Sequence, residues 1–359
     1  MRKLLFSLAI LLGLVSNTLA QIPASNLPSE VKAEDATITK FGHATMTVAV
    51  NIVTDTLTRR TDTLREVIDI EWDTQRGTAK QRNTERGLNP NGSGFYNGDS
   101  NWWLDIYYYS YNYPSINAEG QPVLLSAMAC MPDEDCDYIN NVIIGCHVTI
   151  TSNAQCPSEY VHTGPGGKLS DVGMLMNHAS SGMVFHSLQS NRAYYNLVIM
   201  PDYEGYGITR SHAHPYLYQE LTALQVVDGV RYGIALYKNS PTVSSIRHSF
   251  RSDWRSICVG YSQGGSVAMD TQRFIEQNGL SDELHLAGSV CGDGPYDPIA
   301  TLMYYVKQYN DENPMSMPVV LPLILKGMCD WNPYMKNHQV SDYLNQEFLN
   351  SGILTWLTE

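Results

Sequence analysis

The stretch SICVGYSQGGSVAMDTQRF, residues 256–274, decides the fold of this 359-residue chain. At its centre Ser262 lies between Gly260 and Gly264. Apolar residues before the serine are typical of a short buried strand, and residues 265–277 have partial helical spacing. A serine hydroxyl is a weak nucleophile unless a tight turn projects it towards a base, and flanking glycines leave room for such a turn. The pattern therefore predicts a nucleophile, Ser262, between a strand and a helix.

The residues next to this turn predict where negative charge is stabilised. The backbone N–H of Gln263 begins the helix, so it points to where an oxyanion would form. A second donor is expected from the loop after the strand at residues 142–148, with Thr149, Ile150 and Thr151 as candidates. His147 precedes the nucleophile and ends that strand, so we expect it to have a structural role.

Working outward, short buried strands alternate with longer helical segments. The expected strands cover residues 142–148, 197–201, 256–260 and 286–291, and the expected helices cover 218–237 and 265–277. This alternation predicts a parallel sheet with crossover helices. A hairpin at 103–113 and 123–130, preceded by alternating residues at 36–72, leads into it. The order is that of an α/β class protein with the α/β-hydrolase fold and an N-terminal β-hairpin extension.

The first twenty residues have the order of a cleavable signal peptide. Arg2 and Lys3 precede an apolar run at residues 4–15, and small residues follow up to Ala20. We expect cleavage near Ala20 and a secreted or periplasmic protein without an integral membrane segment. The expected domains are the signal peptide (1–20), an α/β-hydrolase core with its β extension (21–297) and a helical cap segment (298–359).

Composition excludes several classes of function. The chain has 23 basic and 36 acidic residues, which argues against a nucleic-acid partner. His212 and His214 form a His-x-His pair without a nearby third ligand, so no metal site and no other cofactor is expected. Seven cysteines in an exported protein leave at least one unpaired, and the oligomeric state is open.

Four pieces carry a resemblance to a known group: SNAQCPSEY (152–160), PDYEGYG (201–207), HPYL (214–217) and GYSQGG (260–265). They resemble the secretory lipase family and the exported α/β-hydrolases described as prolyl-oligopeptidase-like. The resemblance implies hydrolysis of small-molecule or lipid esters through an acyl-enzyme on Ser262, as in lipid catabolism. It also implies a helical cap from Asp297 onward. There the apolar run 319–325, with Tyr304, Tyr305, Met315 and Met317, would line an acyl site or simply pack as a helix.

The acid and base of a triad are less evident. In this fold they follow the nucleophile on the last two strands, and no further pair of buried strands is visible after residue 291. One explanation is that the chain is truncated inside the cap, before those strands, and has little activity. The other is a local triad of Asp293 or Asp297 with His338. Asp202 and Glu204 are expected to make local hydrogen bonds.

The sequence is also compatible with two alternative functions. A prolyl-oligopeptidase-like exopeptidase would favour an upstream propeller or a carboxylate pair for a substrate amine. A non-catalytic binding protein would keep the α/β-hydrolase fold without the triad.

Overall fold

The computed structural model describes residues 27–54, 61–73, 100–132, 138–160, 184–186, 193–297, 299–301, 303–304, 320–332 and 334–352. The expected signal peptide at residues 1–20 lies outside these ranges, as do residues 305–319. Both remain predictions.

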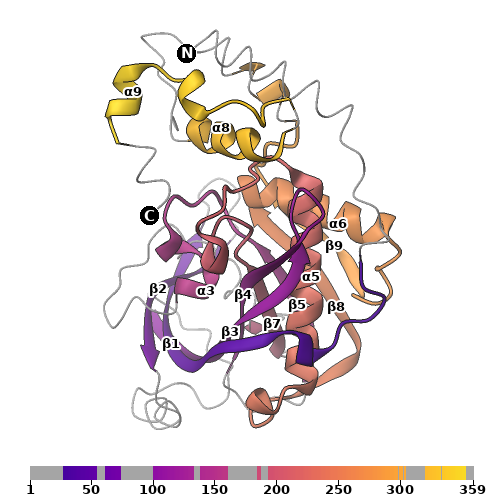
Figure 1. Cartoon of the computed structure of the whole chain (residues 1–359). Helices are drawn as coiled ribbons and strands as arrows, with labels where there is room; N and C mark the ends of the chain where they lie inside the picture. The colour runs from indigo at the N-terminus through magenta and orange to yellow at the C-terminus, as the bar shows by residue number, and fades with distance from the viewer. Residues whose placement is uncertain are drawn as a thin grey trace.

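A single mixed sheet forms the centre of the described part of the chain (Figure 1). Its strands run in the order β2-β1-β3-β4-β7-β5-β8-β9, and a short strand, β6, pairs with β7. Neighbours from β2 to β7 are antiparallel, whereas β7, β5, β8 and β9 are parallel. The bounds are β1 (Thr37–Thr54), β2 (Thr61–Asp73), β3 (Ser100–Ile116), β4 (Pro122–Pro132), β5 (Tyr138–Cys146), β6 (Val184–His186), β7 (Ala193–Pro201), β8 (Ser249–Tyr261) and β9 (Leu286–Gly292).

This topology confirms the parallel strands and the hairpin expected from the sequence. The hairpin is β3 and β4, and the four parallel strands are those predicted from the buried apolar runs. Burial differs between the centre of the sheet and its last strand. Val142 on β5 and Leu197 on β7 are fully buried, whereas Val290 on β9 is 61% exposed. Within the described residues β9 is therefore an edge strand.

Two long helices pack against neighbouring parts of the sheet. Helix α5 (Gln219–Asn239) packs against β3, β4 and β7, and α6 (Gln263–Gln277) packs against β5, β8 and β9. The two helices also contact each other (Figure 1). The short helices are η2 (Ala33–Asp35), η3 (Asn153–Gln155), α3 (Pro157–Tyr160), η4 (Gly207–Thr209) and η5 (Pro241–Val243).

A row of tyrosines joins β3 to α5. The hydroxyls of Tyr109, Tyr111 and Tyr113 donate to the backbone carbonyls of Gly233, Gly229 and Gln225, over 2.9, 2.6 and 3.1 Å. Alternate strand residues share one face about 6.6 Å apart, which is close to the rise of about 6 Å over four helical residues. A Cβ atom on Gly233 would overlap the Tyr111 hydroxyl, so glycine there allows the helix to approach the strand.

The last described elements form a separate apolar cluster at the carboxyl ends of the parallel strands (Figure 1). Helix α8 (Val320–Trp331) buries Leu321, Leu325 and Met328 against Tyr216 and the first turn of α5. Tyr218 stacks on Trp331, with ring centroids 4.6 Å apart. The described part of the apolar run at 319–325 thus packs as a helix face. Tyr304 is 61% exposed, and Tyr305, Met315 and Met317 lie outside the described residues.

Two short elements follow residue 339 within the expected cap segment, η6 (Val340–Asp342) and α9 (Gln346–Asn350). The Asn345 side chain accepts a hydrogen bond from the N–H of Phe348 over 2.8 Å and so begins a new helix. Among the described residues no helix is long and apolar enough to cross a membrane, and the six cysteines they include carry free thiols.

Candidate active site

Ser262 occupies a strained turn between the last residue of β8 and the first residue of α6. Its backbone has φ 55° and ψ −123°, a conformation that residues with a side chain rarely adopt. The N–H of Ser262 donates to the carbonyl of Gly292 over 2.8 Å, and the N–H of Gly265 donates to the carbonyl of Ser262 over 2.9 Å. The strand–turn–helix arrangement predicted from the sequence is present.

The glycines around Ser262 are required by close contacts between backbones. A Cβ atom on Gly260 would overlap the carbonyl of Gly264, and one on Gly264 would overlap the carbonyl of Cys146 at the end of β5. A Cβ on Gly265 would lie 2.5 Å from the carbonyl oxygen of Gly292 at the end of β9. The start of α6 therefore packs closely between the ends of β5 and β9. This packing fixes the direction in which the Ser262 side chain points.

Four segments that are distant in sequence meet at this edge of the sheet. Because β7, β5, β8 and β9 are parallel neighbours, the residues that follow their carboxyl ends come together. These residues are Asp202, His147, Ser262 and Asp293. The carboxyl edge of a parallel sheet is the usual place for a ligand or substrate in an open α/β fold.

His214 contacts the side chain of Gln263 and fixes its position. Its side-chain Nε2 lies 2.6 Å from His214 Nε2, and His214 Nδ1 lies 2.7 Å from the carbonyl oxygen of Glu204. A carbonyl only accepts hydrogen bonds, so Nδ1 carries the proton and Nε2 accepts from the glutamine amide. Burial lowers the pKa of His214 to about 3, which keeps the ring neutral. The sequence did not indicate this contact, because the two residues lie on separate loops.

The loop after β5, which we call the oxyanion loop and define as residues 147–156, faces the same site. Its residue Thr151 already donates its N–H to the Gln155 side chain over 3.1 Å, so this candidate donor is engaged. The Thr149 hydroxyl lies 2.6 Å from the Tyr216 hydroxyl, and no contact of its backbone N–H is described. Of the two threonines named from the sequence, Thr149 remains the candidate for the second oxyanion donor.

His147, the first residue of this loop, is buried. Its ring stacks on Tyr203 with centroids 3.8 Å apart, and its two nitrogens lie 2.7 Å from the Val148 carbonyl and 2.8 Å from the Asp202 carbonyl. Burial lowers its pKa to about 4. This environment agrees with the structural role expected for His147.

The other predicted triad residues have partners of their own within the described part of the chain. Asp293 is exposed, with one carboxylate oxygen 3.4 Å from the Tyr261 hydroxyl. Asp297 accepts a hydrogen bond from the N–H of Ala300 over 2.8 Å. His338 Nδ1 lies 3.7 Å from an Asp342 carboxylate oxygen. The described contacts of these three residues do not include Ser262, so their roles stay predictions.

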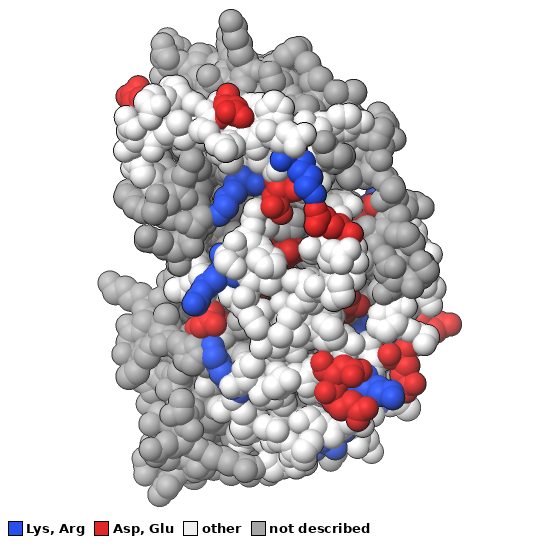
Figure 2. All heavy atoms as spheres, in the orientation of Figure 1, with Lys and Arg blue, Asp and Glu red and all other residues white. Residues whose placement is uncertain are grey.

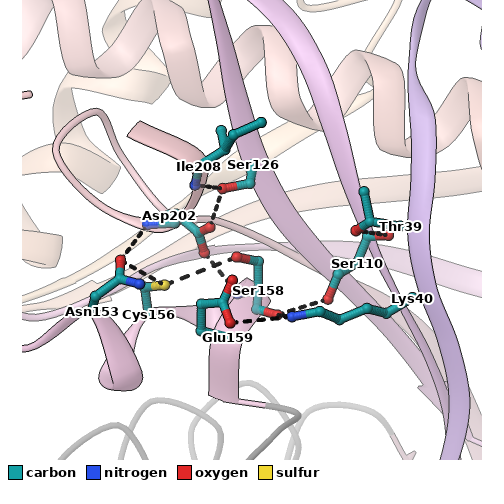
Figure 3. A network of polar contacts seen from close by, with 11 residues as sticks. Thr39, Lys40, Ser110, Ser126, Asn153, Cys156, Ser158, Glu159, Asp202 and Ile208 are labelled. Atoms are coloured by element: carbon teal, nitrogen blue, oxygen red, sulfur yellow. Dashed lines mark hydrogen bonds and ion pairs between the residues drawn. The ribbon is translucent and has the colours of Figure 1, made fainter. Parts of the chain in front are cut away.

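The described hydrogen bonds of Asp202 reach residues far away in the sequence rather than the local partners expected for it, whereas Glu204 has one partner eight residues away. Glu204 contacts His212 over 3.0 Å and Gln225 over 2.8 Å. Asp202 is at the centre of a polar network shown in Figure 3, which reaches β4, the oxyanion loop and α3. Within the described residues no group of three or more His, Cys, Asp or Glu side chains could hold a metal ion.

Comparison with known proteins identifies the fold. No family model and no curated protein matches the sequence. Among solved structures, the rice cell wall degrading esterase LipA from Xanthomonas oryzae matches with a TM-score of 0.53 and 22% identity, over 71% of this chain and 59% of the esterase. A variant of that esterase matches with a TM-score of 0.51 and 22% identity, with 71% and 59% coverage. Lipase A from Candida antarctica has a TM-score of 0.43 and 16% identity, with 68% and 49% coverage.

The chain therefore has an α/β-hydrolase fold, as predicted from its strand and helix order. It spans 59% of the length of the Xanthomonas esterase.

Proposed function

We propose that this chain is a secreted serine hydrolase of the lipase and carboxylesterase type that hydrolyses acyl esters through an acyl-enzyme on Ser262. The observation that carries the proposal is the strained backbone of Ser262 at the carboxyl edge of the parallel strands. Such a conformation costs about 1–3 kcal/mol and persists where the surrounding structure enforces it. The esterase activity named for a protein of the same fold supports the choice of an ester substrate.

The position of Ser262 on the turn supports a two-step reaction with an ester. The Ser262 oxygen attacks the ester carbonyl and loses its proton to a base, and the carbonyl oxygen becomes an oxyanion. The N–H of Gln263 at the start of α6 and an N–H near Thr149 would stabilise it. When the carbon–oxygen bond to the alcohol breaks, the alcohol takes the proton and the acyl group stays on Ser262. Water then releases the acid in a second step.

The base that takes the proton of Ser262 is tested by substitution of His338. His338, predicted as the base with Asp293 or Asp297 as the acid, has Asp342 as its described partner. A base is worth several orders of magnitude in rate, so His338→Ala decides its role. A loss of about a thousandfold or more in kcat/KM would assign it, whereas an unchanged rate would remove it from the mechanism.

The activity is tested with p-nitrophenyl esters of short and medium acyl chains. Ser262→Ala is expected to abolish hydrolysis, because no nucleophile remains at the turn. Ser244→Ala is the matched control, since Ser244 is exposed and its hydroxyl donates to the carbonyl of Pro241 over 2.7 Å. Equal rates for wild type and Ser262→Ala would contradict the proposal.

A non-catalytic binding protein is the second candidate. It is favoured by the two histidines described near the turn, His147 and His214, whose ring nitrogens are engaged and whose pKa values burial lowers to about 4 and about 3. A folded wild-type chain that hydrolyses none of the esters would support this candidate.

A further inference from the structure

Asp202 uses all of its polar groups to hold other segments together (Figure 3). Its N–H donates to the Ser126 carbonyl over 3.0 Å, and its own carbonyl lies 2.8 Å from His147 Nε2. One carboxylate oxygen accepts from the N–H of Ser158 over 2.8 Å, and the other accepts from the Ser126 hydroxyl over 2.5 Å. Asp202 thereby ties the end of β7 to β4, to His147 at the start of the oxyanion loop and to Ser158 in α3, which directly follows the loop.

The segment that follows Asp202 contacts the same loop along its length. The Tyr206 hydroxyl donates to the carbonyl of Ile150 over 2.7 Å, and the N–H of Gly207 donates to the Asn153 side chain over 2.7 Å. The Tyr216 hydroxyl reaches Thr149. These hydrogen bonds hold the loop at Thr149, Ile150 and Asn153, which lie between its two ends.

The surroundings of the Asp202 carboxylate distinguish it from a catalytic acid. The side chain is fully buried, and its described hydrogen-bond donors are a hydroxyl and a backbone N–H. Lys40, the cation labelled in Figure 3, pairs with Glu159 over 3.3 Å. A Cβ atom on Gly207 would overlap both the Ser126 hydroxyl and the Asp202 carboxylate, so no space remains for a substrate.

A buried carboxylate without a cationic partner is costly, and burial raises the pKa of Asp202. Burial of a neutral side chain at this position would cost less free energy. A carboxylate is favoured where strong hydrogen-bond acceptors must fix the positions of other groups. The two groups it accepts from belong to Ser158 in the first turn of α3 and to Ser126 in the middle of β4. The need for fixed geometry is greatest where backbone N–H groups must meet an oxyanion, since a displacement of about 1 Å costs roughly a hundredfold in rate.

We propose that Asp202 is a positioning residue that fixes the oxyanion loop relative to Ser262. The proposal rests on the proposed function for the role of the loop, but the hold of Asp202 on the loop is a physical property that does not depend on activity. Asp202→Ala removes both carboxylate bonds, Asp202→Asn keeps one acceptor, and Ser126→Ala removes one donor. Asp228→Ala is the matched control, because Asp228 is a buried aspartate that bonds to Ser115, away from the loop.

The first readout is hydrogen–deuterium exchange of peptides that cover residues 147–158. Asp202→Ala is expected to raise exchange there by about tenfold or more, because hydrogen bonds to a carboxylate contribute about 1.5–3 kcal/mol. Ser126→Ala should have a smaller effect in the same direction, Asp202→Asn should restore most of the protection, and Asp228→Ala should leave these peptides unchanged relative to the rest of the chain. Unchanged exchange in both Asp202→Ala and Ser126→Ala overturns the proposal, as does an equal effect of Asp228→Ala.

The second readout is ester hydrolysis per folded molecule. Asp202→Ala is expected to lower kcat by about 10- to 100-fold with little change in KM, and Asp202→Asn should recover most of it. A loss confined to KM, or one that Asp202→Asn does not rescue, contradicts a positioning role. A wild-type chain that hydrolyses no ester contradicts the proposed function, whereas the exchange experiment still decides whether Asp202 holds the loop.

Discussion

At the scale of single residues, the strain at Ser262 makes a prediction that is independent of activity. Glycine adopts the observed φ of 55° freely, whereas serine and alanine do not. Ser262→Gly should therefore increase the free energy of unfolding by about 1–3 kcal/mol over Ser262→Ala, although both variants lose the nucleophile. Urea unfolding measures the difference. Equal stabilities of the two variants would show that the turn is not strained.

The residues of the site differ in how far the sequence predicts them. Ser262 and Gln263 are identified by glycines at fixed spacing, which report a local turn. The contact of Gln263 with His214 joins positions 49 residues apart, and the network of Asp202 depends on backbone carbonyls and N–H groups that carry no sequence signal. Such contacts follow from the arrangement of loops at the sheet edge, and only the structure reveals them.

At the scale of elements, the tyrosine row predicts how strongly β3 and α5 are coupled. Tyr111→Phe removes the 2.6 Å bond to the carbonyl of Gly229 but keeps the ring in the core. We expect a loss of about 1 kcal/mol in the free energy of unfolding. Tyr138→Phe is the control, because Tyr138 is 51% exposed. If the two variants are equally stable, the buried hydroxyl contributes nothing to the coupling.

Elements with strong periodicity or continuous apolar runs were predicted well. The hairpin β3–β4, the four parallel strands and helices α5 and α6 all occur where the pattern places them. Within the expected cap segment, two short elements follow residue 339, because Asp342 accepts from the N–H of Gln339 and Asn345 accepts from the N–H of Phe348. Capping signals there compete with helical spacing, and the competition is decided by hydrogen bonds within a few residues.

At the scale of the whole molecule, stability should depend on pH through a buried carboxyl. Burial raises the pKa of Asp228 to about 7, while the Ser115 hydroxyl and the charge of Arg231 lower it in part. The folded state thus prefers protonated Asp228, whose pKa in the unfolded chain is about 3.9. Its contribution to stability is complete below about pH 4 and is lost as the pH rises through about 7.

Asp228→Asn isolates this contribution, because asparagine is neutral at every pH. The free energy of unfolding of wild type relative to Asp228→Asn should fall by on the order of 2–4 kcal/mol between pH 4 and pH 8. Urea unfolding at several pH values measures the difference, and Asp282→Asn at an exposed position is the control. A difference that does not change with pH would contradict the buried acid.

The surface of the molecule agrees with the acidic composition of the chain. Figure 2 shows acidic and basic side chains interspersed in small groups on the visible face, with uncharged surface between them. The formal net charge is −13. On that face no continuous basic area is seen among the described residues.

The central claim is that Ser262 is an activated nucleophile, and a fluorophosphonate probe tests it most directly. The folded chain is incubated with the probe, and the modified residue is located by peptide mass spectrometry. The account predicts one adduct, on Ser262, that is absent in Ser262→Ala and unchanged in Ser244→Ala. A folded wild-type chain that forms no adduct on Ser262 would contradict the claim, and the fold would then serve binding without catalysis.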